Sequence, residues 1–345
     1  MAAPRIIAAL ALALAAPAGA ALAQSPVPKP APPPAAWLPL IGEYGRGARR
    51  LIVLESGGRL EVSNGREPFT LTPAANGFRV DSGPFRGAEA RFARGDDGAV
   101  TGLTLGGLSL PRRAVGTEAG ITFHFTPLHP ADSLRRSALA MQPPSQPAGL
   151  LAPDLVDLTT LDPRIKLDIR YATTNDFLGS AMYTSARAFL QRPAAEALKR
   201  ALRWLVPQGY GLLIHDAYRP WYVTRMFWDA TPDSLHRFVA NPDSGSKHNR
   251  GCAVDLSLYD LRTGASVRMV GGYDEFSPRS YADYPGGTSL QRWYRALLRE
   301  AMEREGFKVI PEEWWHFDYK DWQRYPVLNL TFEQLAARGR QTGRR

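Results

Sequence analysis

The sequence is poor in cysteine, with a single residue of this type, Cys252, among 345. One thiol cannot form a disulfide within the chain. Because no cysteine follows the apolar N-terminal stretch, we expect no lipoprotein anchor. A nucleophilic role for Cys252 is also disfavoured, because no paired histidine and asparagine pattern accompanies it. Stability must therefore come from a packed core, which 44% hydrophobic residues can supply.

Long apolar runs and basic runs are scarce as well. After the N-terminal stretch, no segment offers about 20 consecutive apolar residues, so we expect no stable membrane insertion. The formal net charge is +9, but lysine and arginine are scattered. The one basic run is "RGRQTGRR" at residues 338–345. This distribution argues against nucleic acid as a partner and favours a solvated surface.

The N-terminus is typical of a secretion signal. Arg5 is followed by an apolar stretch, and Ala21 and Ala23 form the small-x-small pattern that signal peptidase cuts. We predict a signal peptide at residues 1–23 and a periplasmic or secreted protein. Residues 24–36, "QSPVPKPAPPPAA", are rich in proline and predict an extended spacer.

Residues 37–126 carry short strand-like runs separated by turn dipeptides such as Gly57-Gly58 and Asn64-Gly65. This pattern of short strands and tight turns predicts a small all-β, barrel-like domain without a group of catalytic residues. The stretch "GEYGRGARRLIVLESGGRLEVS" resembles the β-barrel accessory module appended to some secreted serine hydrolases. That resemblance implies a folding or docking module.

A linker at residues 127–149, rich in Pro, Ala, Ser and Gln, precedes a second domain at 150–335 and a basic tail at 336–345. In the second domain, Pro193 opens an apolar-periodic helix. Thr288 and Gln291 make a capping box before another. Strand-like runs such as "GYGLLIHDAYRP" and "FKVIPEEWWHFDY" alternate irregularly with these helices. The pattern predicts an α+β domain.

One stretch of this domain, "SKHNRGCAVD" at residues 246–255, places a histidine and an aspartate around a glycine. On one regular strand, His248 and Asp255 would point to opposite faces, because their separation of seven is odd. Gly251 can supply the bend that lets them converge. An imidazole and a carboxylate brought together make two-thirds of a catalytic metal site.

The third ligand is expected in "EEWWHF". There the Glu-x-x-His spacing lets His316 bind a metal while Glu313 accepts a proton from water. The other histidines lack such a carboxylate pattern. Taken alone, each pair is more often structural than catalytic. Their joint occurrence selects His248, Asp255 and His316 as ligands and Glu313 as the base.

These motifs together resemble the zinc D-alanyl-D-alanine dipeptidases, the family that includes the vancomycin-resistance dipeptidase. Three further blocks agree, "DIRYATTNDFLG" at 168–179, "DAYRP" at 216–220 and "MVGGYDEFSP" at 269–278. The resemblance covers about residues 150–330. It implies a peptidase domain with a central antiparallel sheet and flanking helices, and one Zn²⁺ per chain.

The resemblance also implies roles at the substrate. Asp274 would meet the ammonium of a dipeptide, Ser246 would hold its carboxylate, and Arg219 would lie beside the scissile carbonyl. Asp216 is assigned to the substrate site, although it could simply pair with Arg219. Likewise Asp274 could cap a turn, and Ser246 could cap a loop.

The implied activity is hydrolysis of D-Ala-D-Ala to two D-alanines in cell-wall peptide turnover. One alternative is a D,D-carboxypeptidase acting on longer stem peptides of peptidoglycan. A second alternative is a non-catalytic wall-binding protein. The partner is a small dipeptide, and cell-wall contact through the N-terminal domain is left open. Tyr171 and Trp314 are expected to pack around the site.

Overall fold

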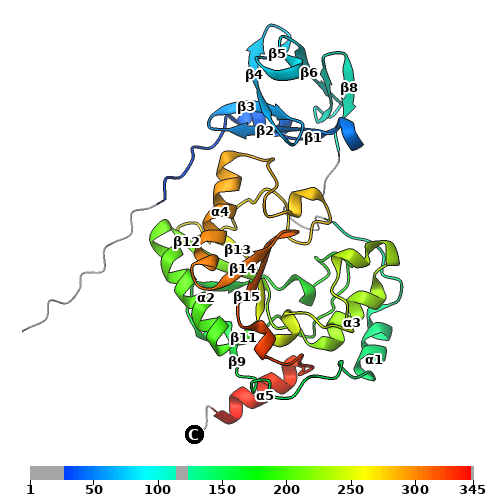
Figure 1. Cartoon of the computed structure of the whole chain (residues 1–345), viewed down its shortest axis with the longest axis vertical. Helices are drawn as coiled ribbons and strands as arrows, with labels where there is room; N and C mark the ends of the chain where they lie inside the picture. Colours follow the sequence, from blue (N-terminus) through cyan, green and yellow to red (C-terminus); the bar gives the residue numbers. More distant parts are fainter. Residues whose placement is uncertain (1–26, 114–122, 343–345) are drawn as a thin grey trace, which may run out of the picture.

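The computed structural model describes residues 27–113 and 123–342. The predicted signal peptide and its cleavage site lie outside the described residues. Figure 1 shows a lobe of short strands at the N-terminal end of the chain and a larger lobe of helices around a sheet.

The N-terminal lobe is an antiparallel sheet of eight strands paired in chain order. The strands are β1 Gly42–Tyr44, β2 Leu51–Ser56, β3 Arg59–Ser63, β4 Pro68–Ala74, β5 Gly77–Val80, β6 Glu89–Arg94, β7 Val100–Leu105 and β8 Leu108–Pro111. A bridge between Tyr44 and Arg112 joins the two ends of the sheet. Buried side chains such as Val53, Val62 and Leu103 fill the interior. The expected barrel-like domain is therefore confirmed as a near-closed barrel.

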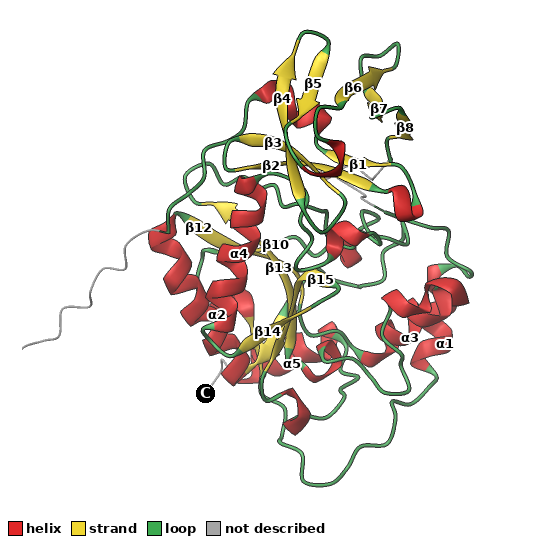
Figure 2. Ribbon diagram, turned by 45° about the horizontal axis from the view of Figure 1, so that its top comes forward, coloured by secondary structure: helices red, strands yellow, loops and turns green. Residues whose placement is uncertain are grey.

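The expected linker contains a helix, α1 Ala131–Leu139. Leu134 and Ala138 are buried in the large hydrophobic core of the second lobe. Figure 2 shows α1 beside α3 Trp221–Ala230. The polar composition of residues 127–149 concealed this helix, because only its inner face is apolar.

The second lobe is built on a five-stranded sheet in the order β10-β12-β13-β15-β14. Its strands are β10 Ile165–Leu167, β12 Tyr210–Asp216, β13 Ala253–Asp260, β14 Phe307–Ile310 and β15 Glu313–Tyr319. A small separate sheet pairs β9 Leu155–Asp157 with β11 Phe189–Gln191. The α+β class is confirmed. The expectation of an antiparallel central sheet was wrong for one edge, because β10 runs parallel to β12 after a long crossover that includes α2, so the sheet is mixed.

Two long helices flank this sheet, α2 Arg192–Leu205 and α4 Ser289–Glu303. Pro193 lies in the first turn of α2, where its missing N–H costs nothing. Thr288 and Gln291 form the expected capping box on α4. A last helix, α5 Phe332–Thr342, follows the sheet. Within the described ranges, none of the helices is both long and apolar enough to cross a bilayer.

Candidate metal and active site

The site lies where β12, β13 and β15 run side by side. His248 stands in a single 3-10 turn, His248–Arg250, immediately before β13. Gly251 ends that turn with φ of 65°. A Cβ at Gly251 would lie 2.5 Å from Cδ2 of Leu155, so both the backbone conformation and the space require glycine. This bend turns His248 toward the strand that carries Asp255.

Asp255 and His316 are direct partners in the pairing of β13 with β15. Nε2 of His248 lies 3.4 Å from Oδ1 of Asp255, and Nδ1 of His316 lies 3.0 Å from the same oxygen. The two imidazole nitrogens are 3.1 Å apart. All three residues are buried, and within the described ranges they form a group that could hold a metal ion.

These distances fit a tetrahedral metal ion. With zinc bonds of about 2.0–2.1 Å, the ligand atoms of such an ion lie about 3.4 Å apart. The hydrogen bonds also leave the inner atoms free to bind. Nδ1 of His248 donates to the carbonyl oxygen of Ala217 at 2.6 Å, and Nε2 of His316 donates to Oδ1 of Asp318 at 2.8 Å.

In neutral imidazoles, the nitrogens that face each other therefore both carry lone pairs. Oδ1 of Asp255 is buried and accepts no hydrogen bond from the described residues. Burial lowers the pKa of His316, but the negative charges of the neighbouring Asp255 and Asp318 carboxylates outweigh it and raise the pKa to about 10. Three converging lone pairs around a position that favours positive charge are suited to a cation.

Each ligand is oriented by a neighbour behind it. The hydroxyl of Tyr273 donates to Oδ2 of Asp255 at 3.1 Å, which leaves Oδ1 facing the histidines. Nζ of Lys247 donates to Oδ2 of Asp318 at 2.7 Å, and so fixes the carboxylate that holds His316. Such contacts set the orientation and basicity of metal ligands.

Glu313 begins β15 and lies beside the group. Its Oε2 is 3.7 Å from Nδ1 of His316. Although 29% of its side-chain surface is accessible through the pocket, protein surrounds the carboxylate, and this desolvation raises the pKa of Glu313 to about 7. A carboxylate with this pKa can take up and release a proton near neutral pH.

Arg219 follows β12 and is 8% exposed. Its Nε and Nη2 donate to Oδ2 of Asp216 at 3.0 and 2.7 Å, while the hydroxyl of Tyr183 donates to Oδ1 at 2.5 Å. The guanidinium lies over the rings of Tyr171 and Phe227. Asp216 is fully buried, so the structure places it behind Arg219 instead of at the substrate surface.

A pocket of about 440 Å³ opens over the group. Its lining includes Arg219, Ser246, Asp274 and Glu313. Oδ2 of Asp274 is buried without a hydrogen-bond partner among the described residues, and burial raises the pKa of Asp274 well above its usual range. Such a carboxylate is suited to a cationic ligand group.

Ser246 has a local role as well as a place in the pocket. Its Oγ accepts a hydrogen bond from the backbone N–H of His248 at 3.2 Å, and its own N–H donates to Oδ1 of Asn249 at 2.7 Å. The hydroxyl proton remains available to a ligand. Trp314 is buried in the core, and Tyr171 is buried but reaches the pocket wall.

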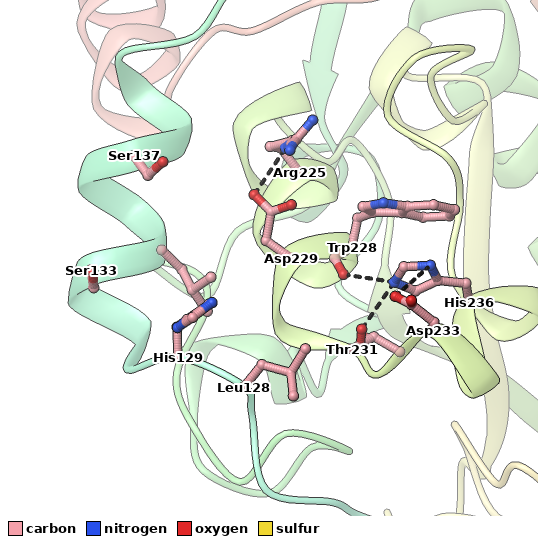
Figure 3. A pocket seen from close by; sticks show the side chains of 11 residues that line it. Leu128, His129, Ser133, Ser137, Arg225, Trp228, Asp229, Thr231, Asp233 and His236 are labelled. Carbon is pink, nitrogen blue, oxygen red and sulfur yellow. Dashed lines mark hydrogen bonds and ion pairs between the residues drawn. The ribbon is translucent and has the colours of Figure 1, made fainter.

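A second pocket, of about 530 Å³, lies between α1 and α3 (Figure 3). Nε2 of His236 lies 3.1 and 2.9 Å from the carbonyl oxygens of Trp228 and Thr231. Its ring stacks on Trp228. Within the described ranges, this pocket contains no cluster comparable to the His-Asp-His group.

The single cysteine is buried beside the site. Burial raises the pKa of Cys252 to about 12, so its thiol stays protonated at neutral pH. This agrees with the interpretation that Cys252 is not a nucleophile.

The sequence reasoning did not identify Tyr273, Lys247 or Asp318. Asp318 lies two residues after His316 and therefore on the same face of β15, which is a signal that alternation could have offered. Tyr273 is adjacent to Asp274, but nothing in the sequence shows that its hydroxyl reaches Asp255.

The fold and the site define a metal-dependent hydrolase of the peptidase class. The family model for D-Ala-D-Ala dipeptidase, Peptidase M15, matches residues 152–335, and the chain belongs to this family. The resemblance seen in the motifs is thereby confirmed.

Relatives named D-alanyl-D-alanine dipeptidase support this assignment. The protein of Escherichia coli (strain K12) is 36% identical over 188 residues, which cover 54% of this chain and 96% of the relative. The protein of Enterococcus faecium is 34% identical over 186 residues, which cover 49% of this chain and 92% of the relative. The protein of Streptomyces coelicolor (strain ATCC BAA-471 / A3(2) / M145) is 33% identical over 175 residues, which cover 46% of this chain and 87% of the relative. The β-barrel precedes the matched family region.

Proposed function

We propose that this chain is a zinc-dependent dipeptidase that hydrolyses D-Ala-D-Ala to two D-alanines. The observation that carries the proposal is the buried group of His248, Asp255 and His316 with Glu313 beside it. The family and the names of its relatives supply the substrate class.

His248, Asp255 and His316 would hold the ion, and two nitrogens with one carboxylate oxygen are a ligand set that zinc accepts. A bound zinc ion would supply Lewis acidity, which makes water more acidic and polarises a carbonyl group. Asp318, Ala217 and Tyr273 keep the three ligands in the orientation that this requires.

Glu313 moves the proton. Its carboxylate accepts a proton from the attacking water and then donates it to the departing amine. A pKa of about 7 allows both steps near neutral pH. The position of Glu313 next to His316 places this base at the same end of the pocket as the ligands.

Arg219 stabilises negative charge that grows on the carbonyl oxygen as water attacks. Its guanidinium is held by Asp216 and by two aromatic rings, so it does not have to reorganise during the reaction. Removing one such donor typically lowers the rate by about 10²–10³-fold.

Asp274 and Ser246 recognise the two ends of the zwitterionic substrate. The unpartnered oxygen of Asp274 receives the ammonium, and the Ser246 hydroxyl donates to the carboxylate. We assign the activity to cell-wall peptide turnover outside the cytoplasm, a location supported by the signal-like residues 1–23.

One assay tests the substrate and the metal together. Release of D-alanine is measured from D-Ala-D-Ala and from a wall pentapeptide, and release of L-alanine is measured from the dipeptide L-Ala-L-Ala. Each substrate is tested with and without a chelator. We expect chelator-sensitive turnover of D-Ala-D-Ala. Turnover of the pentapeptide alone would instead favour the D,D-carboxypeptidase, and no turnover with less than one zinc per chain would favour a wall-binding protein.

A further inference from the structure

The loop that presents Asp274 adopts a strained conformation. Among the described residues, Asp274 is the one non-glycine residue with a positive φ, at 55°. Aspartate tolerates this region better than most residues, but the surroundings must still hold it there. The neighbouring Tyr273 also orients Asp255. The loop therefore borders both the substrate side and the metal side of the site, but the ligands Asp255 and His316 are carried by the paired strands β13 and β15.

Part of the support comes from inside the loop. The carboxylate of Glu275 accepts hydrogen bonds from the N–H of Gly272 at 2.9 Å and from the hydroxyl of Ser277 at 2.5 Å. Nε of Arg279 lies 3.1 Å from the same carboxylate. These contacts make the tip compact, but they do not connect it to the rest of the molecule.

The β-barrel supplies an outer support. Ile52 and Leu54 of β2 form a buried cluster with Val270 and Tyr284, which lie on either side of the loop tip. The backbone N–H of Glu55 donates to the carbonyl of Gly287 at 3.0 Å. In Figure 1 and Figure 2 the N-terminal strands lie next to α4 and the chain leading into it.

Two buried glutamates of the barrel accept hydrogen bonds from residues of the peptidase domain. Glu43 accepts a hydrogen bond from the hydroxyl of Tyr284 at 2.9 Å. Glu55 accepts hydrogen bonds from the N–H of Ser289 at 2.7 Å and from its hydroxyl at 3.1 Å. Ser289 is the first residue of α4, so the Glu55 carboxylate also faces the positive end of that helix. Arg292 donates to the carbonyl of Glu55 at 2.8 Å.

The chain segment after the barrel supports the other side of the loop. The ring of Phe123 stacks on Phe276, two residues after Asp274, with centroids 4.7 Å apart and an interplanar angle of 25°. Phe276 lines the substrate pocket. The N–H of Phe125 donates to the carbonyl of Phe177, another pocket residue, at 3.0 Å.

All of these outer partners precede residue 152, where the matched family region begins. We propose that the β-barrel and the segment at Phe123 act as a brace that positions the loop 269–288, and with it Asp274, for the substrate ammonium. Glu55 is a positioning residue in this brace. The inference rests on the proposed dipeptidase activity and goes beyond it, because it assigns the barrel a role in substrate binding.

The brace predicts a particular kinetic signature. If Asp274 shifts when the loop loosens, the ammonium is held less well while Glu313 and the ligands stay in place. In full-length Glu55→Ala we expect the KM for D-Ala-D-Ala to rise about tenfold and kcat to change less than about twofold. Glu55→Gln keeps an acceptor oxygen for Ser289 and should recover most of the affinity.

Two matched controls separate positioning from general destabilisation. Glu89→Ala removes an exposed carboxylate of β6 whose ion pair, to Arg91, stays within the barrel, and should leave KM unchanged. Leu54→Ala and Leu71→Ala both truncate a buried leucine of the barrel lobe, but only Leu54 belongs to the cluster with Val270 and Tyr284. Only Leu54→Ala should raise KM. Equal KM values for each matched pair would overturn the brace.

A binding measurement keeps this test separate from turnover. In a Glu313→Gln background, calorimetric titration with D-Ala-D-Ala should show about tenfold weaker binding when Glu55→Ala is added. If the unaltered protein does not hydrolyse D-Ala-D-Ala, the proposed function fails. If it does, and Glu55→Ala changes neither KM nor this binding, the brace alone fails.

Discussion

Two buried carboxylates of the barrel and two of the peptidase domain differ in how their oxygens are satisfied. In the barrel, both carboxylate oxygens of Glu43 and of Glu55 have polar partners. One partner of each glutamate belongs to the peptidase domain, Tyr284 for Glu43 and Ser289 for Glu55. In the peptidase domain, one oxygen of Asp255 and one of Asp274 are buried without a hydrogen bond from the described residues. A buried charge is costly unless it is satisfied. The satisfied carboxylates of Glu43 and Glu55 hold the two domains together, whereas the unsatisfied oxygens of Asp255 and Asp274 are suited to bind cationic groups in the pocket.

The largest expected effect comes from the base. Glu313→Gln keeps the shape of the side chain but cannot accept a proton, so turnover of D-Ala-D-Ala should fall by about 10³-fold. Because Glu313 is not among the proposed ligands, bound zinc measured by elemental analysis should stay at the level of the unaltered protein. Unchanged turnover would remove Glu313 from the mechanism.

A smaller loss is expected at Arg219. Lysine keeps the charge but cannot reproduce the two-nitrogen contact with Asp216, so Arg219→Lys should lower kcat by about 10²-fold. Steady-state kinetics separates this from a binding defect, since KM should change much less. A change confined to KM would mean that Arg219 contacts the substrate without acting on the transition state.

Tyr273→Phe tests how the buried carboxylate of Asp255 is oriented. Without the hydroxyl, Oδ2 of Asp255 loses its partner, and the affinity for zinc should fall by about tenfold. Competition with a chromogenic chelator measures this directly. The matched variant Tyr281→Phe alters an exposed tyrosine of the same loop and should leave the affinity as it was.

Asp176 is a third incompletely satisfied carboxylate among the described residues of the peptidase domain. Its Oδ2 is buried without a hydrogen bond from the described residues, yet the residue does not line the substrate pocket. Burial raises the pKa of Asp176 from 3.8 to about 6. The folded state thus binds the proton more tightly than the unfolded chain. The stabilisation is complete below pH 3.8 and is lost as the pH rises through 6, by at most about 3 kcal/mol.

Asp176→Asn removes this titration. We expect the variant to be more stable than the unaltered protein at pH 7 and to show a flatter dependence of unfolding free energy on pH between 4 and 7. Chemical denaturation across that range measures both. A lower stability of the variant at pH 7 would mean that the ionised form of Asp176 has a partner of its own.

Much of the site could be predicted from the sequence, because the residue patterns that indicate it are local. His248 and Asp255 are only seven positions apart, with the bend at Gly251 between them. Glu313 and His316 are three positions apart. The structure brings these groups together through one pairing register, Asp255 opposite His316. The assignment of Asp216 to the substrate side did not anticipate its full burial, because burial depends on Tyr183 and Arg219 together.

The amino-acid order alone specified the starts of α2 and α4, the turns of the barrel and the chemistry of the metal ligands, because caps, glycine bends and side-chain donors act over short separations. Tertiary structure alone decided that β10 runs parallel to β12, that Tyr273 reaches Asp255, and that Glu55 of the barrel meets the start of α4. These contacts join residues between 18 and more than 200 positions apart. Their energy depends on burial and register, which no local pattern encodes.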